Sequence, residues 1–183
     1  DAFQRVLSGL AGVAGTVVDI GAGTGHGVLA AAEALPDADI VAVEPSPTMR
    51  TALLSRIMQT GNLRQRVTVI PAAFEDAPLP EQVRAVLFLG CVGFVDDEAR
   101  RNFWSRLAAH MPPGGVVLFD VMMISTPQRV GKMHLAEIPV GHHAYHVWLE
   151  GVPQDAQHEK WLLTYQIAKE IGAIFMVDMA HYA

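Results

Sequence analysis

The sequence predicts an α/β fold, a doubly wound and mainly parallel sheet with helices on both faces, followed by an antiparallel β meander. Two observations predict it. Short apolar segments alternate with helical ones over residues 1–124, which is the order of parallel strands joined by crossover helices. Residues 125–183 instead contain strand-like segments separated by turn residues. We therefore predict two domains, a core at 1–124 and a β cap at 125–183.

A glycine-rich turn follows the first predicted strand. Thr16–Ile20 is short and rich in β-branched residues, as expected of a central parallel strand. Gly21, Gly23 and Gly25 lack Cβ atoms, so the turn can adopt positive φ angles and lie against a bound molecule. The helix predicted at about 27–35 would direct its N-terminal amides into this turn. The sequence therefore predicts a ligand site where this strand meets its helix.

The segments that follow repeat the alternation of strand and helix. Four further strands are predicted, at residues 39–44, 66–70, 83–89 and 116–122. One helix is predicted from Pro47 to about Thr60, with Ser46 as its N-cap and Gly61-Asn62 at its end. A second helix is predicted from Asp96 to His110, with acidic residues in its first turn. Its candidate core contacts are Phe103, Trp104 and Leu107.

The glycine turn resembles a motif of a known family. Residues 19–25 read Asp-x-Gly-x-Gly-x-Gly, whereas a dinucleotide-binding fingerprint would need its third glycine at His26. This form resembles motif I of the class I S-adenosylmethionine-dependent methyltransferases, whose core is Rossmann-like. Glu44 ends the second strand, where an acid can accept hydrogen bonds from both hydroxyls of a ribose. The next residues, through Met49, resemble motif II, in which the methionine lies near the adenine.

The segment 71–80 resembles motif III, in which the backbone and a side-chain acid meet the adenine edge. The chain departs from the pattern here, because Ala73 stands where the family usually has aspartate. Adenine recognition is left to the Phe74 amide, to packing of Phe74, or to Glu75. The tip of the 83–89 strand lies, in this family, beside the methionine part of the cofactor.

The resemblance covers roughly residues 1–124 and implies S-adenosylmethionine as cofactor, with S-adenosylhomocysteine as product. The cofactor-binding residues that it implies are Asp19, Gly21, Ala22, Gly23, Gly25, Glu44, Pro45, Ser46, Met49, Ala73, Phe74, Glu75, Leu89, Gly90 and Cys91.

Composition narrows the classes of partner. The 183 residues, 51% of them hydrophobic, can bury one substantial core. The net charge is −6, lysine is scarce and the arginines form no cluster, so a nucleic-acid substrate is disfavoured. No apolar run approaches the roughly 20 residues that span a bilayer, so no membrane partner is expected. Cys91 stands alone, which excludes an internal disulfide and fits a cytoplasmic location.

The last third of the chain is predicted to form a meander over the open end of the parallel sheet. Its strand-like segments are 132–139, 141–151, 159–170 and 173–180, with hairpin connections at 151–155 and 170–172. This arrangement resembles that of small-molecule methyltransferases in which a β insertion follows the fifth strand and covers the acceptor pocket. No further helix and strand close the fold, which favours a fragment of a longer protein over a meander that replaces the usual ending.

Histidines concentrate in this last third. His142, His143 and His146 could converge on a metal ion only if residues 141–144 form a turn, and polar faces of a meander are the favoured interpretation. No metal site is therefore predicted. A histidine could instead act as general base for an acceptor. His134 and His142 are the catalytic candidates.

We expect methyl transfer from S-adenosylmethionine to an oxygen, nitrogen or carbon of a small metabolite, by in-line displacement. Two alternatives stay open: a non-methylating reaction such as cyclisation, or a regulatory role for bound S-adenosylmethionine. A nicotinamide dinucleotide is disfavoured by His26. The expected partner is a small-molecule acceptor, and the sequence leaves a homodimer open.

Overall fold

The computed structural model of the chain describes residues 2–121, 126–156, 158–169 and 174–182. By its contacts the chain divides into two compact units, residues 1–121 and 122–183, and each is considered separately below. The division into a cofactor-binding domain at 1–124 and a substrate cap at 125–183 stays a prediction. No helix among the described residues is long and apolar enough to cross a membrane.

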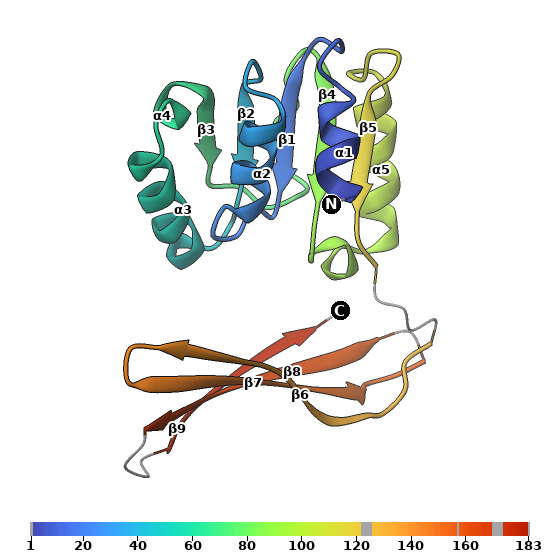
Figure 1. Cartoon of the computed structure of the whole chain (residues 1–183). Helices are drawn as coiled ribbons and strands as arrows, with labels where there is room; N and C mark the ends of the chain where they lie inside the picture. Colours follow the sequence, from blue (N-terminus) through green and yellow to red (C-terminus); the bar gives the residue numbers. More distant parts are fainter. Residues whose placement is uncertain (1, 122–125, 157, 170–173, 183) are drawn as a thin grey trace. The chain divides into compact units, whose positions relative to one another are not determined.

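The first unit contains a five-stranded sheet in the order β3-β2-β1-β4-β5, in which every neighbouring pair is parallel (Figure 1). The strands are β1 (Thr16–Ile20), β2 (Ile40–Val43), β3 (Val67–Ile70), β4 (Val83–Phe88) and β5 (Val116–Phe119). Strand order reverses between β1 and β4, which are neighbours in the sheet although β2 and β3 lie between them in sequence. In open parallel sheets, ligands bind at the carboxyl ends of the strands beside such a reversal.

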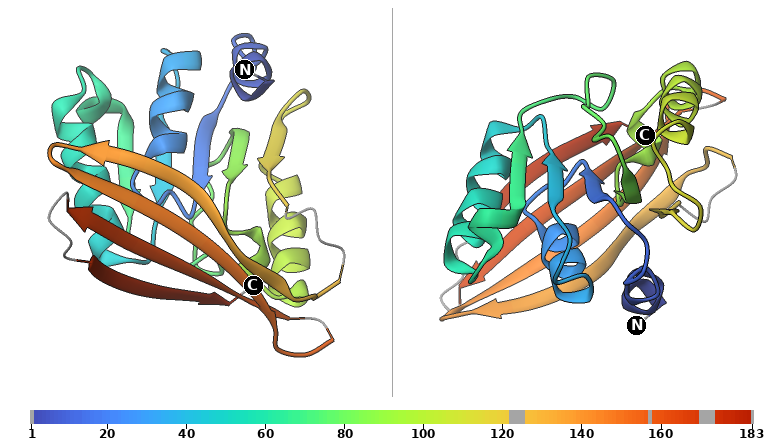
Figure 2. Two further views of the ribbon diagram at one scale, coloured as in Figure 1. Left: turned by 60° about the horizontal axis from the view of Figure 1, so that its bottom comes forward. Right: turned by 90° about the horizontal axis from the view of Figure 1, so that it is seen from above.

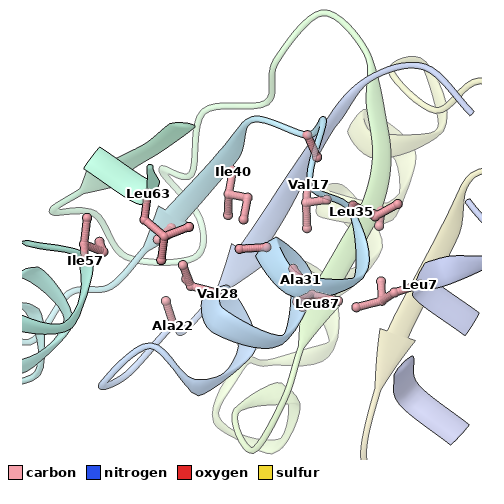
Figure 3. Packing of buried hydrophobic residues seen from close by; sticks show 14 of the residues in the cluster. Leu7, Val17, Ala22, Val28, Ala31, Leu35, Ile40, Ile57, Leu63 and Leu87 are labelled. Atoms are coloured by element: carbon pink, nitrogen blue, oxygen red, sulfur yellow. The ribbon is translucent and has the colours of Figure 1, made fainter. Parts of the chain in front are cut away.

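Helices cover both faces of this sheet, as predicted. They are α1 (Ala2–Ser8), α2 (His26–Ala34), α3 (Pro47–Gln59), α4 (Leu63–Arg66), the 3-10 turn η1 (Val92–Phe94) and α5 (Asp97–Ala108). One buried cluster joins α1, α2 and α3 to one face of the sheet, with Val28, Ile57 and Leu87 among its members (Figure 3). A second cluster joins Phe103 and Leu107 of α5 to the other face, and Figure 2 shows α5 across the sheet from α2.

Local sequence signals account for the helix starts. The Ser46 hydroxyl accepts a hydrogen bond from the Met49 amide at 3.4 Å, and Pro47 is the first residue of α3. The Asp96 carboxylate accepts one from the Ala99 amide at 2.9 Å at the start of α5. Both predicted helix starts are confirmed to within one residue.

Two of the boundaries that differ from the prediction in this unit have an identifiable structural cause. Strand β5 ends at Phe119 rather than at 122; Asp120 turns out of the strand to accept a hydrogen bond from Gly90, and Met122 lies outside the described residues. The short helix α4 is absent from the prediction, and it includes Arg66, which the sequence assigns to the third strand. The Arg66 guanidinium donates to the carbonyls of Leu35 and Ala38 at the end of α2, a long-range contact that local sequence does not reveal.

The second unit is an antiparallel sheet in the order β6-β7-β8-β9 (Figure 1). Its strands are β6 (Val130–Val140), β7 (His143–Pro153), β8 (Glu159–Lys169) and β9 (Ile174–Tyr182). The predicted meander is confirmed, and its placement over the parallel sheet stays a prediction.

The predicted hairpin connection at 151–155 is wrong. Gly151 and Pro153 belong to β7, and the chain turns after them, where the Gln154 amide donates to the His158 carbonyl. Gly151 is required for packing rather than for a turn: a Cβ there would lie 2.5 Å from Glu159 Oε1 and 3.0 Å from the Trp161 ring. The connection predicted at 170–172 lies outside the described residues.

Candidate functional site

The carboxyl ends of β1, β2 and β4 bring together the glycine turn, Glu44 and the segment 89–91, which the sequence singled out. Because β1 pairs in parallel with both β2 and β4, the glycine turn after Ile20 lies between Glu44 and the segment 89–91. This is the strand edge to which the arrowheads point in Figure 1. Three segments that are distant in sequence thus border one site.

Glu44 holds the glycine turn in place. It is 6% exposed, and its Oε2 accepts a hydrogen bond from the Gly23 amide at 2.8 Å. Its Oε1 accepts one from the Ser46 amide, also at 2.8 Å. Each carboxylate oxygen has a second lone pair, so these bonds leave capacity for ligand hydroxyls. The sequence predicted Glu44 as a ligand residue and missed its function in fixing the turn.

The first glycine of the turn lies against Cys91. Gly21 has a φ of 65°, and a Cβ there would lie 2.7 Å from Cys91 Sγ. The thiol donates a hydrogen bond to the Ile20 carbonyl at 3.2 Å. Burial, followed by the negative charges of nearby carboxylates, raises the pKa of Cys91 to about 12. Cys91 therefore stays a thiol that joins two strand ends, and it is no nucleophile.

The third glycine marks the start of α2. Gly25 has a φ of 95°, and a Cβ there would lie 2.6 Å from Leu53 Cδ1 of α3. A side chain at this position would therefore be both strained and obstructed. His26, the next residue, is exposed, and its Nε2 lies 3.0 Å from Nη1 of Arg56.

Asp19 lies beneath the turn as a buried carboxyl group. It is 2% exposed, and burial is the main cause that raises its pKa from 3.8 to about 7. The Val28 amide donates a hydrogen bond to this carboxyl group, and that bond lowers the pKa and so partly opposes the effect of burial. Its Oδ2 has no hydrogen-bond partner in the described part of the chain, and a Cβ on Gly27 would lie 2.5 Å from it. A buried acceptor without a partner fits a site where a ligand donates the missing bond.

The segment after β3 is divided between core and surface. The Phe74 ring is buried; it stacks on Phe88 at a centroid distance of 5.1 Å and contacts Phe103 at 4.6 Å. The ring thus contributes mainly to the core, and adenine recognition by the Phe74 amide or by packing of Phe74 stays a prediction. Ala73 and Glu75 are exposed. Glu75 borders a depression of about 400 Å³ against α5, which includes neither the glycine turn nor Glu44.

Asp120 borders the site and was missed from the sequence. Its Oδ1 accepts a hydrogen bond from the Gly90 amide at 2.6 Å. The signal that would have found it is the one that selected Asp19 and Glu44, an acid at the end of an apolar strand.

The histidine candidates lie in the second unit. His134 is exposed on β6, and its Nε2 is 3.2 Å from Nδ1 of His146 on the paired strand. Its ring also lies 4.7 Å from that of Trp148. His142 is exposed in the connection between β6 and β7. Within the described residues, His, Cys, Asp and Glu form no group of three or more that could hold a metal ion.

Comparison with known proteins gives one curated relative and several solved structures. The chain is 38% identical over 74 residues to the type II methyltransferase M.XamI of Xanthomonas campestris pv. amaranthicola, which is 40% of this chain and 14% of that protein. The chain thus spans only a small part of this curated relative.

Two solved structures share the fold across the chain. The sugar N-methyltransferase KedS8 from Streptoalloteichus sp ATCC 53650 has a TM-score of 0.73 at 21% identity, covering 99% of this chain and 70% of KedS8. CalS10, an amino pentose methyltransferase from Micromonospora echinaspora, has a TM-score of 0.74 at 16% identity, covering 100% of this chain and 73% of CalS10. Residues 17–115, more than half of the sequence, match the family described as methyltransferase domain, and they contain the glycine turn, Glu44 and the β4 tip. The chain belongs to this methyltransferase domain family.

Proposed function

We propose that this protein is a methyltransferase that binds S-adenosylmethionine and methylates a small molecule. The observation that carries the proposal is the glycine turn, held by Glu44 beside the strand reversal of a methyltransferase domain. Bound S-adenosylmethionine supplies an activated methyl group on a cationic sulfur. CalS10, whose structure contains bound S-adenosylmethionine, supports this choice of ligand.

The residues at the strand ends suit the parts of this ligand. Glu44 would accept hydrogen bonds from the ribose hydroxyls with the lone pairs that Gly23 and Ser46 leave free. The carboxyl of Asp19 would receive a hydrogen bond from the ammonium group of the methionine part. We also propose as cofactor-binding residues the others that the family resemblance implies, namely Gly21, Ala22, Gly25, Pro45, Met49, Ala73, Glu75 and Leu89.

A small-molecule acceptor is supported by the relatives and by charge. KedS8 and CalS10 are described as methyltransferases of sugars, an N-methyltransferase and an amino pentose enzyme respectively. The net charge of −6 disfavours a polyanionic substrate. Of the two catalytic candidates, His134 is favoured over His142. Its Nε2 lies next to Nδ1 of His146, so a proton that His134 takes from the acceptor can be shared with a second ring nitrogen.

Calorimetric titration with S-adenosylhomocysteine tests the ligand. We expect saturable binding with one site per chain and no binding of NAD. Incubation with methyl-labelled S-adenosylmethionine and candidate acceptors tests the reaction, and labelled acceptor is the expected result. Binding of NAD in place of S-adenosylhomocysteine would overturn the proposal, and so would consumption of the cofactor with the label retained on its sulfur.

A further inference from the structure

Asp120 is a carboxylate in a defined position at the strand edge. It directly follows β5, and Phe119 is the register partner of Phe88 at the end of β4. The hydrogen bond from the Gly90 amide to its Oδ1, at 2.6 Å, fixes the carboxylate beside the β4 tip. Leu89, Gly90 and Cys91 form that tip, which is the segment we assign to the methionine end of the cofactor.

Asp120 differs from the other two carboxylates of this edge. Asp19, Glu44 and Asp120 all raise the pKa of the Cys91 thiol, so the three carboxyl groups lie near this one side chain. Asp19 and Glu44 are 2% and 6% exposed. Asp120 is exposed, and no lysine, arginine or histidine forms an ion pair with it within the described ranges.

Open space adjoins Gly90, the hydrogen-bond partner of this carboxylate. Gly90 has a φ of 69°, and within the described residues no atom outside Leu89, Gly90 and Cys91 lies within 4 Å of the position that a Cβ on Gly90 would take. By contrast, a Cβ on Gly21, on the β1 side of the tip, would lie 2.7 Å from Cys91 Sγ. The β4 tip is therefore open at Gly90, the residue whose amide Asp120 accepts from.

We propose that Asp120 binds the amino group of the methyl acceptor, and that the acceptor is therefore an amine. The group binds as an ammonium and releases one proton to solvent past the exposed Asp120 carboxylate, which leaves its nitrogen with the lone pair that accepts the methyl group. This inference rests on the proposed function. A fixed, exposed carboxylate beside a vacant approach pairs best with a cation that also donates hydrogen bonds, and an ammonium group does both. A neutral alcohol or carbon acceptor would make no charge-assisted hydrogen bond of this kind with Asp120.

Sinefungin tests the proposal without an identified acceptor. In this analogue of S-adenosylmethionine, a carbon that bears an amine replaces the methylated sulfur. Its amine therefore stands where the transferred methyl group meets the acceptor, whereas S-adenosylhomocysteine has nothing there. Both ligands are titrated by calorimetry into the wild type, Asp120→Asn and Asp39→Asn. The amide oxygen that Asp120→Asn introduces can still accept from the Gly90 amide, and Asp39 is an exposed acid at the opposite end of the sheet.

We expect the wild type and Asp39→Asn to bind sinefungin about tenfold more tightly than S-adenosylhomocysteine, as for a charge-assisted hydrogen bond. In Asp120→Asn this preference should fall to near unity, with affinity for S-adenosylhomocysteine and thermal stability unchanged. A preference that persists in Asp120→Asn, or is absent from the wild type, overturns this inference alone. Failure of the wild type to bind S-adenosylhomocysteine overturns the proposed function and this inference with it.

Discussion

Asp19 makes the stability of the protein depend on pH in a predictable direction. Its pKa is about 7 in the folded chain and 3.8 when unperturbed, so between these values the folded state keeps a proton that the unfolded state releases. The free energy of unfolding therefore falls as pH rises through this window, and the loss is complete above pH 7. Between pH 5 and pH 8 the titration of Asp19 should lower the free energy of unfolding by about 3 kcal/mol.

The Asp19→Asn variant checks this prediction. Asparagine has nearly the same shape and does not ionise, so the variant should lose about 3 kcal/mol less stability than the wild type between pH 5 and pH 8. Urea unfolding of both proteins at the two pH values measures the difference, and titration of the eight histidines cancels in the comparison. Parallel pH dependence in both proteins would show that Asp19 is ionised in the folded state.

We expect cofactor binding to depend strongly on Glu44, which holds the glycine turn through two hydrogen bonds. In Glu44→Gln one oxygen becomes an amide donor that must face the Gly23 or Ser46 amide, so the turn loses one of its two restraints. We expect affinity for S-adenosylhomocysteine to fall more than about tenfold, since a buried hydrogen bond to a charged group contributes roughly 1.5–3 kcal/mol. Glu33→Gln on the exposed side of α2 is the matched control. Equal affinity of Glu44→Gln and the control would contradict the assignment.

At the scale of the element, α5 depends on its cap. The Asp96 carboxylate satisfies the Ala99 amide at 2.9 Å, and Asp97 and Glu98 add negative charge at the same helix end. Asp96→Ala should destabilise the protein by about 1 kcal/mol, whereas Asp96→Asn should be nearly neutral because asparagine also caps. Chemical denaturation of both variants checks this. A loss of equal size in both variants would assign the effect to charge rather than to capping.

At the scale of the whole molecule, an aromatic cluster joins α5, the sheet and the segment after β3. Phe103 is 1% exposed and contacts both Phe74 at 4.6 Å and Trp104 at 5.2 Å. Phe103→Ala should cost about 3–5 kcal/mol, because it removes buried surface and leaves a cavity. Met58→Ala, at a side chain that is 61% exposed, should change stability by less than about 0.5 kcal/mol. Denaturant unfolding compares the two, and a small loss in Phe103→Ala would mean that the cluster repacks.

The elements that sequence predicted well have local causes. Strand β1 has the predicted ends because an apolar run is bounded by Gly15 and Gly21, which both adopt positive φ angles. The faces of α5 follow from helical spacing, and Phe103 and Leu107 are buried as expected. Asp120 was missed because the predicted strand continued to residue 122 and placed this acid inside it, and because its partner Gly90 is 30 residues away. The hairpin after β7 was misplaced because Gly151 indicates a turn in the sequence, whereas in the structure a glycine is required there to leave room for Glu159 on the next strand.

By itself the sequence determined the class of fold, the order of strands and helices, and the glycine turn with its two acids, since periodicity, caps and turn residues act over a few positions. Only the tertiary structure decided what each acid does. Asp19 is buried, Glu44 holds the turn, and Asp120 lies exposed beside the β4 tip. Burial and long-range hydrogen bonds set the charge and the direction of a carboxylate, and both depend on the segments that the fold brings against it.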